Sequence, residues 1–163
     1  MRKKENLKVV YLHGLDAQGI GPKHEYLDTF GTAIYPQIEY RDVDAWDKIK
    51  KIVEREKPDY IIGSSMGGWF AFNLGNLLNI PTVLFNPALQ GRTIEPVIPK
   101  EDLKGKYRPL HVFTLGRKDV VVKASETIVT LDKTDIKYVV DYNQGGHRIS
   151  EELFIRTVRL NTK

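Results

Sequence analysis

The sequence has no cysteine among its 163 residues. Without thiols, the chain cannot form a disulfide framework, a thiolate zinc site or a catalytic cysteine. It also lacks any apolar run near the ~20 residues that a membrane-spanning helix requires. The basic N-terminal segment has no apolar stretch ending in a small-residue cleavage site, which argues against a secretory signal. We therefore expect a cytoplasmic protein with no membrane partner.

The sequence has no large excess of either positive or negative charge. The chain has 25 Lys and Arg against 21 Asp and Glu, a net charge of +4. Opposite charges are interleaved, as in residues 48–57 (KIKKIVEREK). An RNA-binding fingerprint and a zinc-finger spacing are both missing. We interpret the charges as a solvated surface and expect no nucleic-acid partner.

No repeat, low-complexity tract or long linker interrupts the chain, and its length fits one domain over residues 1–163. Short β-rich runs alternate with helical segments. We expect strands at residues 8–12, 33–40, 59–63, 82–85, 110–115 and 136–142. We expect helices at residues 22–30, 45–57 (with Asp44 as cap), 66–78 and 123–132, and a last helix capped by Ser150.

Several of these strands are continuous apolar runs, which is typical of strands covered on both faces. Strands that alternate with helices form right-handed βαβ units. The sequence therefore predicts an α/β fold, a three-layer α/β/α sandwich around a mainly parallel sheet of about six strands. Pro36 lacks a backbone N–H, so its strand is expected at or near a sheet edge.

Residues of catalytic type follow several of the predicted strands. Functional sites of parallel sheets lie beyond the carboxyl ends of the strands. Gly63-x-Ser65-x-Gly67 stands between an apolar strand and an apolar helix, the context of a nucleophile elbow. The neighbours of such a serine must be small because strand and helix backbones approach closely, and Gly68 adds room. The alternative is a glycine-rich turn or phosphate loop, although the Gly-Lys-Ser/Thr of a Walker A loop is missing.

A serine hydroxyl needs an adjacent base, usually histidine. His147 follows the last predicted strand after two glycines and is our candidate base. The base in turn needs a carboxylate to orient it. Asp119, after the fifth strand, is the best candidate; Asp141, within the last strand, is a weaker rival, and Asp16 is a loop acid.

The turn after the first strand carries His13 and Gly14. We expect His13 to organise this loop rather than act as a base. The backbone N–H groups of Leu15 and Met66 are predicted to form an oxyanion hole.

We expect neither a metal nor a cofactor. The sequence lacks HExxH, and its histidines fall in separate segments. His24 is predicted on a helix surface and His111 in the core. No G-x-G-x-x-G follows a strand, which argues against a dinucleotide site.

The order Ser65, Asp119, His147 is that of the α/β-hydrolases. More narrowly, the chain resembles the small YqiA-type esterase-like family of bacterial proteins. The resemblance rests on residues 9–15 (VVYLHGL), 61–71 (IIGSSMGGWFA), 83–88 (VLFNPA), 115–120 (LGRKDV) and 144–147 (QGGH). It implies a serine esterase or thioesterase with these three residues as nucleophile, acid and base. It also implies the core of an α/β-hydrolase sheet without the N-terminal antiparallel strands. The segment of residues 87–108 is short and leaves little material for a lid.

The sequence thus predicts a serine hydrolase that cleaves carboxylic esters of small or medium acyl groups through an acyl-enzyme. Its partner would be a small-molecule ester or thioester. We expect Trp69, Phe70 and the loop with Asn86 and Pro87 to line the pocket, with core packing as the alternative. A thioesterase, amidase or acyltransferase using the same triad, or a non-catalytic hydrolase-fold binding protein, are the competing interpretations.

Overall fold

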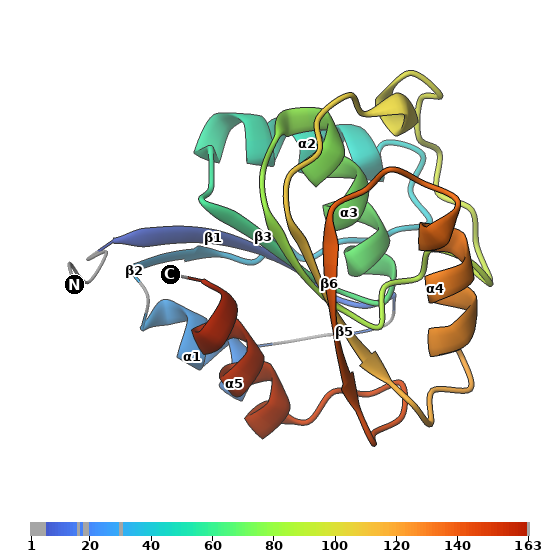
Figure 1. The fold of residues 1–163 in the computed structure, drawn as a ribbon. Coiled ribbons are helices and arrows are strands. Elements are labelled where there is room, and N and C mark those ends of the chain that lie inside the picture. The colour runs from blue at the N-terminus through green and yellow to red at the C-terminus, as the bar shows by residue number, and fades with distance from the viewer. Residues whose placement is uncertain (1–5, 16, 18–19, 30, 163) are drawn as a thin grey trace.

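The computed structural model describes residues 6–15, 17, 20–29 and 31–162, in which strands and helices alternate (Figure 1). Six parallel strands form one sheet in the order β2-β1-β3-β4-β5-β6. The strands are β1 Leu7–Leu12, β2 Gly31–Ile34, β3 Tyr60–Ser64, β4 Thr82–Phe85, β5 His111–Gly116 and β6 Tyr138–Asn143.

Helices cover both faces of this sheet. Helices α1 and α5 lie on one face, and α2, α3 and α4 lie on the other (Figure 1). The helices are α1 Pro22–Asp28, α2 Ala45–Glu56, α3 Met66–Leu78, α4 Ala124–Asp132 and α5 Glu151–Asn161, with a 3₁₀ turn η1 at Asp102–Lys104. The predicted three-layer α/β/α sandwich with a mainly parallel sheet of six strands is confirmed. None of the described helices is both long and apolar enough to cross a membrane.

Two hydrophobic clusters fill the spaces between the layers. Val10 and Leu12 of β1 point into the cluster under α2, α3 and α4, whereas Val9 and Tyr11 point into the cluster under α1 and α5. Successive side chains of a strand alternate between faces, so a strand buried on both faces must be apolar at every position. This is why the strands read as continuous apolar runs.

Helix boundaries largely follow the local chemistry. The predicted bounds of α3 are confirmed, and the helix ends at Asn79 in the left-handed conformation. Ser150 caps α5, since its side chain accepts a hydrogen bond from Leu153 N at 3.2 Å. Asp44 stands at the N-cap of α2, but its side chain makes no capping bond and pairs with Lys48 instead. The described part of α1 ends at Asp28; Phe30 lies outside the described residues.

The prediction of a strand over residues 33–40 is wrong in extent. Strand β2 ends at Ile34, and Tyr35 to Tyr40 form a connection to α2. Pro36 cannot donate to a ladder. The apolar residues beyond it are buried for another reason: Tyr40 packs edge-on against Phe70 of α3, with ring centroids 4.9 Å apart. The expected position of β2 at a sheet edge is confirmed.

Candidate active site

Ser65 stands between the last residue of β3 and the first residue of α3. Its backbone has φ 51° and ψ −115°, a conformation that an L-residue rarely adopts. Such a conformation costs about 1–3 kcal/mol and persists only where the surroundings impose it. Here Ser65 N donates to Phe85 O at 3.0 Å, and Ser65 O accepts from Ala88 N at 2.9 Å. Both bonds tie the turn to β4 and the segment after it.

The glycines around Ser65 are required by space. A Cβ atom on Gly63 would come within 3 Å of Gly67 and Gly68 backbone atoms, and one on Gly67 would collide with the carbonyl oxygen of Leu12. A Cβ on Gly68 would meet Pro87 at 2.7–2.8 Å. The close approach expected from the sequence is therefore present.

Three side chains from different strand ends meet at this turn. His147 Nε2 lies 3.0 Å from Ser65 Oγ, and His147 Nδ1 lies 2.8 Å from Asp119 Oδ2. The Asp119 side chain has no exposed surface. Its second oxygen, Oδ1, accepts hydrogen bonds from the backbone N–H groups of Val121 and Val122, both at 2.8 Å.

These contacts define the proton positions. An ionised carboxylate only accepts hydrogen bonds, so His147 Nδ1 donates to Asp119. In the neutral imidazole the lone pair is then on Nε2, facing the hydroxyl of Ser65. The arrangement can take the Ser65 proton and stabilise the resulting cation. Asp141, the weaker rival, is exposed on β6, and Asp16 lies outside the described residues.

Asn86 has a role that the sequence did not reveal. It follows β4, is 1% exposed and has φ 42°. Its Nδ2 donates to the carbonyl oxygens of Gly146 (3.1 Å) and His147 (2.9 Å), while its Oδ1 accepts from Gly116 N (2.8 Å). One amide thus joins the loop of His147 to the end of β5, three residues before Asp119. The only signal was an asparagine at a strand end, a residue that tolerates positive φ.

Ser65 and His147 open into a cleft of about 570 Å³. Gly14, Leu15 and Met66 also line it. Met66 is the first residue of α3, so its N–H has no acceptor within the helix. The positive end of the helix dipole is there as well.

Trp69, Phe70, Asn86 and Pro87, which we expect in the pocket, are not among the described residues that line this cleft. Phe70 packs into the core, and the Arg92 guanidinium covers Trp69 at 4.1 Å from the ring centroid. Ala88, within the predicted loop, does line the cleft. Trp69 and Phe70 belong to α3, whereas Asn86 and Pro87 follow β4, where the Asn86 amide bonds to the loop of His147.

His13 organises the first loop. Its Nδ1 bonds to Gly14 O, and its Nε2 accepts from Ile38 N at 2.8 Å. The hydroxyl of Tyr40 also donates to His13 O at 2.6 Å. These contacts fasten the loop carrying Leu15 to the segment after β2.

The remaining two histidines are structural. His111 is fully buried, as predicted: Thr82 Oγ1 donates to Nδ1 (2.7 Å), and Nε2 donates to Asn76 Oδ1 (2.9 Å). Burial lowers its pKa to about 4. The surface prediction for His24 is wrong, since it is only 9% exposed and accepts a hydrogen bond from Gly21 N at 3.0 Å. Its Nδ1 thereby closes the first turn of α1.

A family model matches residues 8–106, more than half of the chain, and its description is "Uncharacterised protein family (UPF0227)". The chain belongs to this family. The matched span of UPF0227 includes Ser65 and Asn86 and ends before Asp119 and His147. Among curated proteins, the comparison found no match.

Solved structures with the α/β-hydrolase fold resemble this UPF0227 member. Est1E from Butyrivibrio proteoclasticus, solved with ferulic acid bound, has a TM-score of 0.72 at 16% identity, covering 96% of this chain and 88% of its own. SOBER1 from Arabidopsis thaliana has 0.67 at 14%, covering 96% and 99%. The mouse alpha/beta hydrolase domain-containing protein 10 has 0.67 at 16%, covering 91% and 85%. At these identities the likeness establishes the fold, and the expected resemblance to the α/β-hydrolases is confirmed.

Proposed function

We propose that this protein is a serine hydrolase that cleaves carboxylic esters of small or medium acyl groups through an acyl-enzyme. The observation that carries the proposal is the chain of hydrogen bonds from Asp119 through His147 to Ser65, 2.8 and 3.0 Å long. Core packing does not require this arrangement, because the strained backbone that presents Ser65 to His147 adds nothing to the burial of apolar side chains. The bound ferulic acid of Est1E and the shared fold agree with an ester substrate.

The reaction begins when Ser65 Oγ attacks the ester carbonyl carbon and His147 Nε2 takes the hydroxyl proton. The N–H groups of Leu15 and Met66 hold the oxyanion of the tetrahedral intermediate. His147 then gives its proton to the leaving alcohol as the C–O bond breaks, which leaves an acyl group on Ser65. Asp119 stays ionised and stabilises the imidazolium in both steps.

Deacylation repeats these steps with water. His147 takes a proton from the attacking water, and the second tetrahedral intermediate again places its oxyanion at Leu15 and Met66. When the intermediate collapses, the proton returns to Ser65 Oγ and the carboxylic acid leaves. An acceptor other than water would make the same intermediate an acyltransferase step, so product analysis separates the two.

The cleft is compatible with such substrates. It is about 570 Å³, and Val121, Val122 and Ile149 give it apolar surface for an acyl group. Between β4 and β5 the chain has only the short turn η1 and no longer helix, so this connection supplies no helical lid. Water for deacylation can therefore reach the site.

The test combines labelling and turnover. A fluorophosphonate should label the protein, and peptide mapping should place the label on Ser65 rather than on its neighbour Ser64. Ser65→Ala should abolish both labelling and hydrolysis of short aryl esters. Ser125→Ala, on the exposed side of α4, is the matched control and should retain both. Absence of label on the wild-type protein, together with no hydrolysis of esters, thioesters or amides, would reject the proposal in favour of a binding protein.

A further inference from the structure

The Ser65 cleft is lined by three cationic side chains, Lys23, Arg92 and Arg148. Among the described residues that line it, none is aspartate or glutamate. The chain as a whole has nearly as many acidic as basic residues, so a lining of one sign is not a reflection of composition. The three cations differ in the groups that each already contacts within the protein.

Arg92 is already satisfied within the protein. Its Nε pairs with Glu95 at 3.1 Å, and one terminal nitrogen donates to the carbonyl oxygens of Ala88 (2.8 Å) and Leu89 (2.6 Å). Its guanidinium also stacks on Trp69. Arg92 holds the segment after β4 in place, and its charge is already paired with Glu95.

Lys23 is different. It lies on α1, is half-buried, and has no carboxylate at ion-pairing distance among the described residues. Its ammonium lies 5.6 Å from the ring centroid of Phe154. Glu151 shares with Lys23 an adjoining hollow of about 270 Å³, and no ion pair joins the two. Burial lowers the Lys23 pKa.

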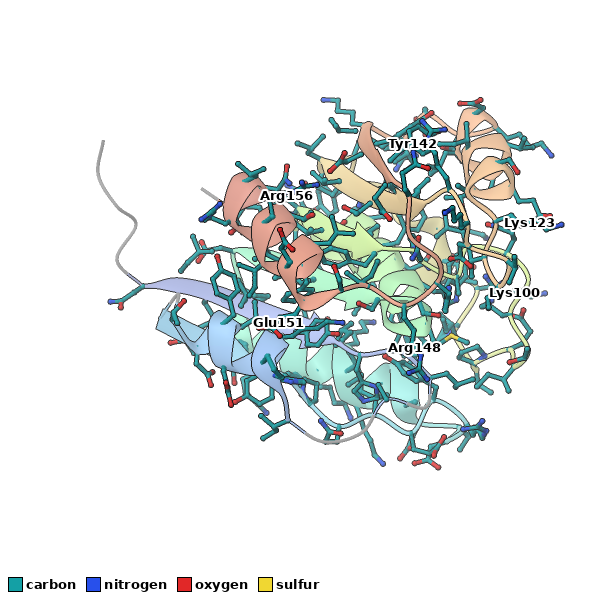
Figure 2. All side chains as sticks on the ribbon, turned by 90° about the horizontal axis from the view of Figure 1, so that it is seen from below. Lys100, Lys123, Tyr142, Arg148, Glu151 and Arg156 are labelled. Carbon is teal, nitrogen blue, oxygen red and sulfur yellow. The ribbon has the colours of Figure 1, made fainter. Side chains whose placement is uncertain are left out.

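Arg148 is the second unpaired cation. It follows His147 in the segment that joins β6 to α5, and its side chain is exposed. Arg148 is labelled in Figure 2. Within the described part of the chain its guanidinium has no partner. Two cations that have no counter-ion among the described residues thus line the cleft that contains Ser65.

A half-buried ammonium without an anionic partner loses hydration, and the contact of Lys23 with the Phe154 ring offsets only part of that loss. The loss is offset when a ligand brings an anion to it, and the attraction is stronger in a cleft than in bulk water. We propose that the cleft takes esters that carry a carboxylate or phosphate group besides the scissile bond, and that Lys23 binds this anion. Arg148 adds positive potential at the opening. The inference rests on the proposed hydrolase function.

The experiment uses matched esters of one phenol. Butyrates of phenols with a 3-methyl, 3-carboxymethyl or 3-phosphonomethyl group vary the charge on the alcohol and separate carboxylate from phosphate. The hemiglutarate of the 3-methyl phenol places a carboxylate on the acyl side. The quantity measured is the ratio of kcat/KM for each anionic ester to kcat/KM for the neutral one.

For the wild-type protein we expect this ratio to exceed one for at least one anionic ester and to fall as ionic strength rises. Lys23→Met should lower the ratio by about tenfold or more, as expected for loss of a charge-assisted contact. Lys23→Arg should restore part of it. Lys133→Met is the matched control at the far end of α4, and its ratio should equal that of the wild type.

Two results would overturn the inference while leaving the hydrolase intact. One is a wild-type protein that hydrolyses the neutral ester and gives a ratio of one or less for every anionic ester. The other is a ratio above one that Lys23→Met leaves unchanged although the variant folds by circular dichroism. A protein that hydrolyses none of the esters and takes no fluorophosphonate label overturns the proposed function and this inference together.

Discussion

The amide nitrogen of Asn86 donates a hydrogen bond of 2.9 Å to the carbonyl oxygen of His147, 61 positions further along the chain. The same side chain accepts from Gly116 N at 2.8 Å. The imidazole and the carboxylate that orients it therefore share a single buried anchor at the end of β4. Movement of either loop would break a hydrogen bond that water cannot easily replace.

Replacement of this anchor should weaken both stability and turnover. Asn86→Ala leaves two carbonyl groups and the Gly116 N–H without their partner, which costs about 1–3 kcal/mol for each unsatisfied buried group. We expect lower stability in urea and a fall in kcat larger than any rise in KM, because the change displaces His147, the proposed base, rather than the cleft. Asn161→Ala, which removes one bond at the end of α5, serves as the control. Equal kcat and stability in Asn86→Ala and wild type would contradict the role assigned to Asn86.

The strained turn allows function and stability to be separated at one position. Ser65→Ala should lower hydrolysis by roughly 10⁴–10⁶, since members of a triad act as one unit. Ser65→Gly should be equally inactive but more stable than Ser65→Ala by about 1 kcal/mol, because glycine adopts φ 51° without steric cost. Chemical denaturation of the two variants measures the difference. An alanine variant as stable as the glycine variant would mean that the turn is not strained.

Gly67 should not tolerate any side chain. A methyl group there collides with the Leu12 carbonyl, a rigid backbone atom, so we expect Gly67→Ala to cost about 3 kcal/mol or more. Gly21→Ala is the matched control, since a Cβ at Gly21 meets nothing within 4 Å. Thermal unfolding should separate them clearly. Similar melting temperatures would show that β1 and α3 can move apart.

His111 should make the protein acid-sensitive. Burial holds its pKa near 4, against 6.5 for an unburied histidine, so the unfolded chain binds a proton that the folded chain refuses between these values. The contribution of this residue to the free energy of unfolding is fully present above pH 6.5 and decreases as the pH falls towards 4. The total decrease is about 3 kcal/mol. The difference in unfolding free energy between wild type and His111→Asn should shrink over that range. A constant difference would place the histidine pKa elsewhere.

The fold could be predicted because its signals are local. Apolar runs, helix periodicity and capping residues such as Ser150 depend on a few neighbours along the chain. The turn at Ser65 was also predictable, because Gly63 and Gly67 stand two positions on either side of the serine, where the close approach of strand and helix requires small residues. The apolar segment after β2 resembles a strand in sequence, because packing of Tyr40 against α3 requires the same apolar residues as a sheet does.

What the sequence could not supply depends on side-chain direction between distant segments. Asn86 looked like a pocket residue, and only the meeting of two loops at its amide reveals an anchor. Its place on a helix suggests a surface position for His24, yet its ring packs edge-on against Tyr35, with centroids 4.8 Å apart. The contact between Trp69 and Arg92 likewise depends on two segments that are distant along the chain.

The three groups of the proposed triad are spread over the ends of β3, β5 and β6. During synthesis on the ribosome, a nascent chain that has not yet released the segment with His147 holds the serine without its base. Under the proposed mechanism such an intermediate is chemically silent. Hydrolytic reactivity would then appear late in translation, after the strands of the sheet have been made, and would report that the fold is complete.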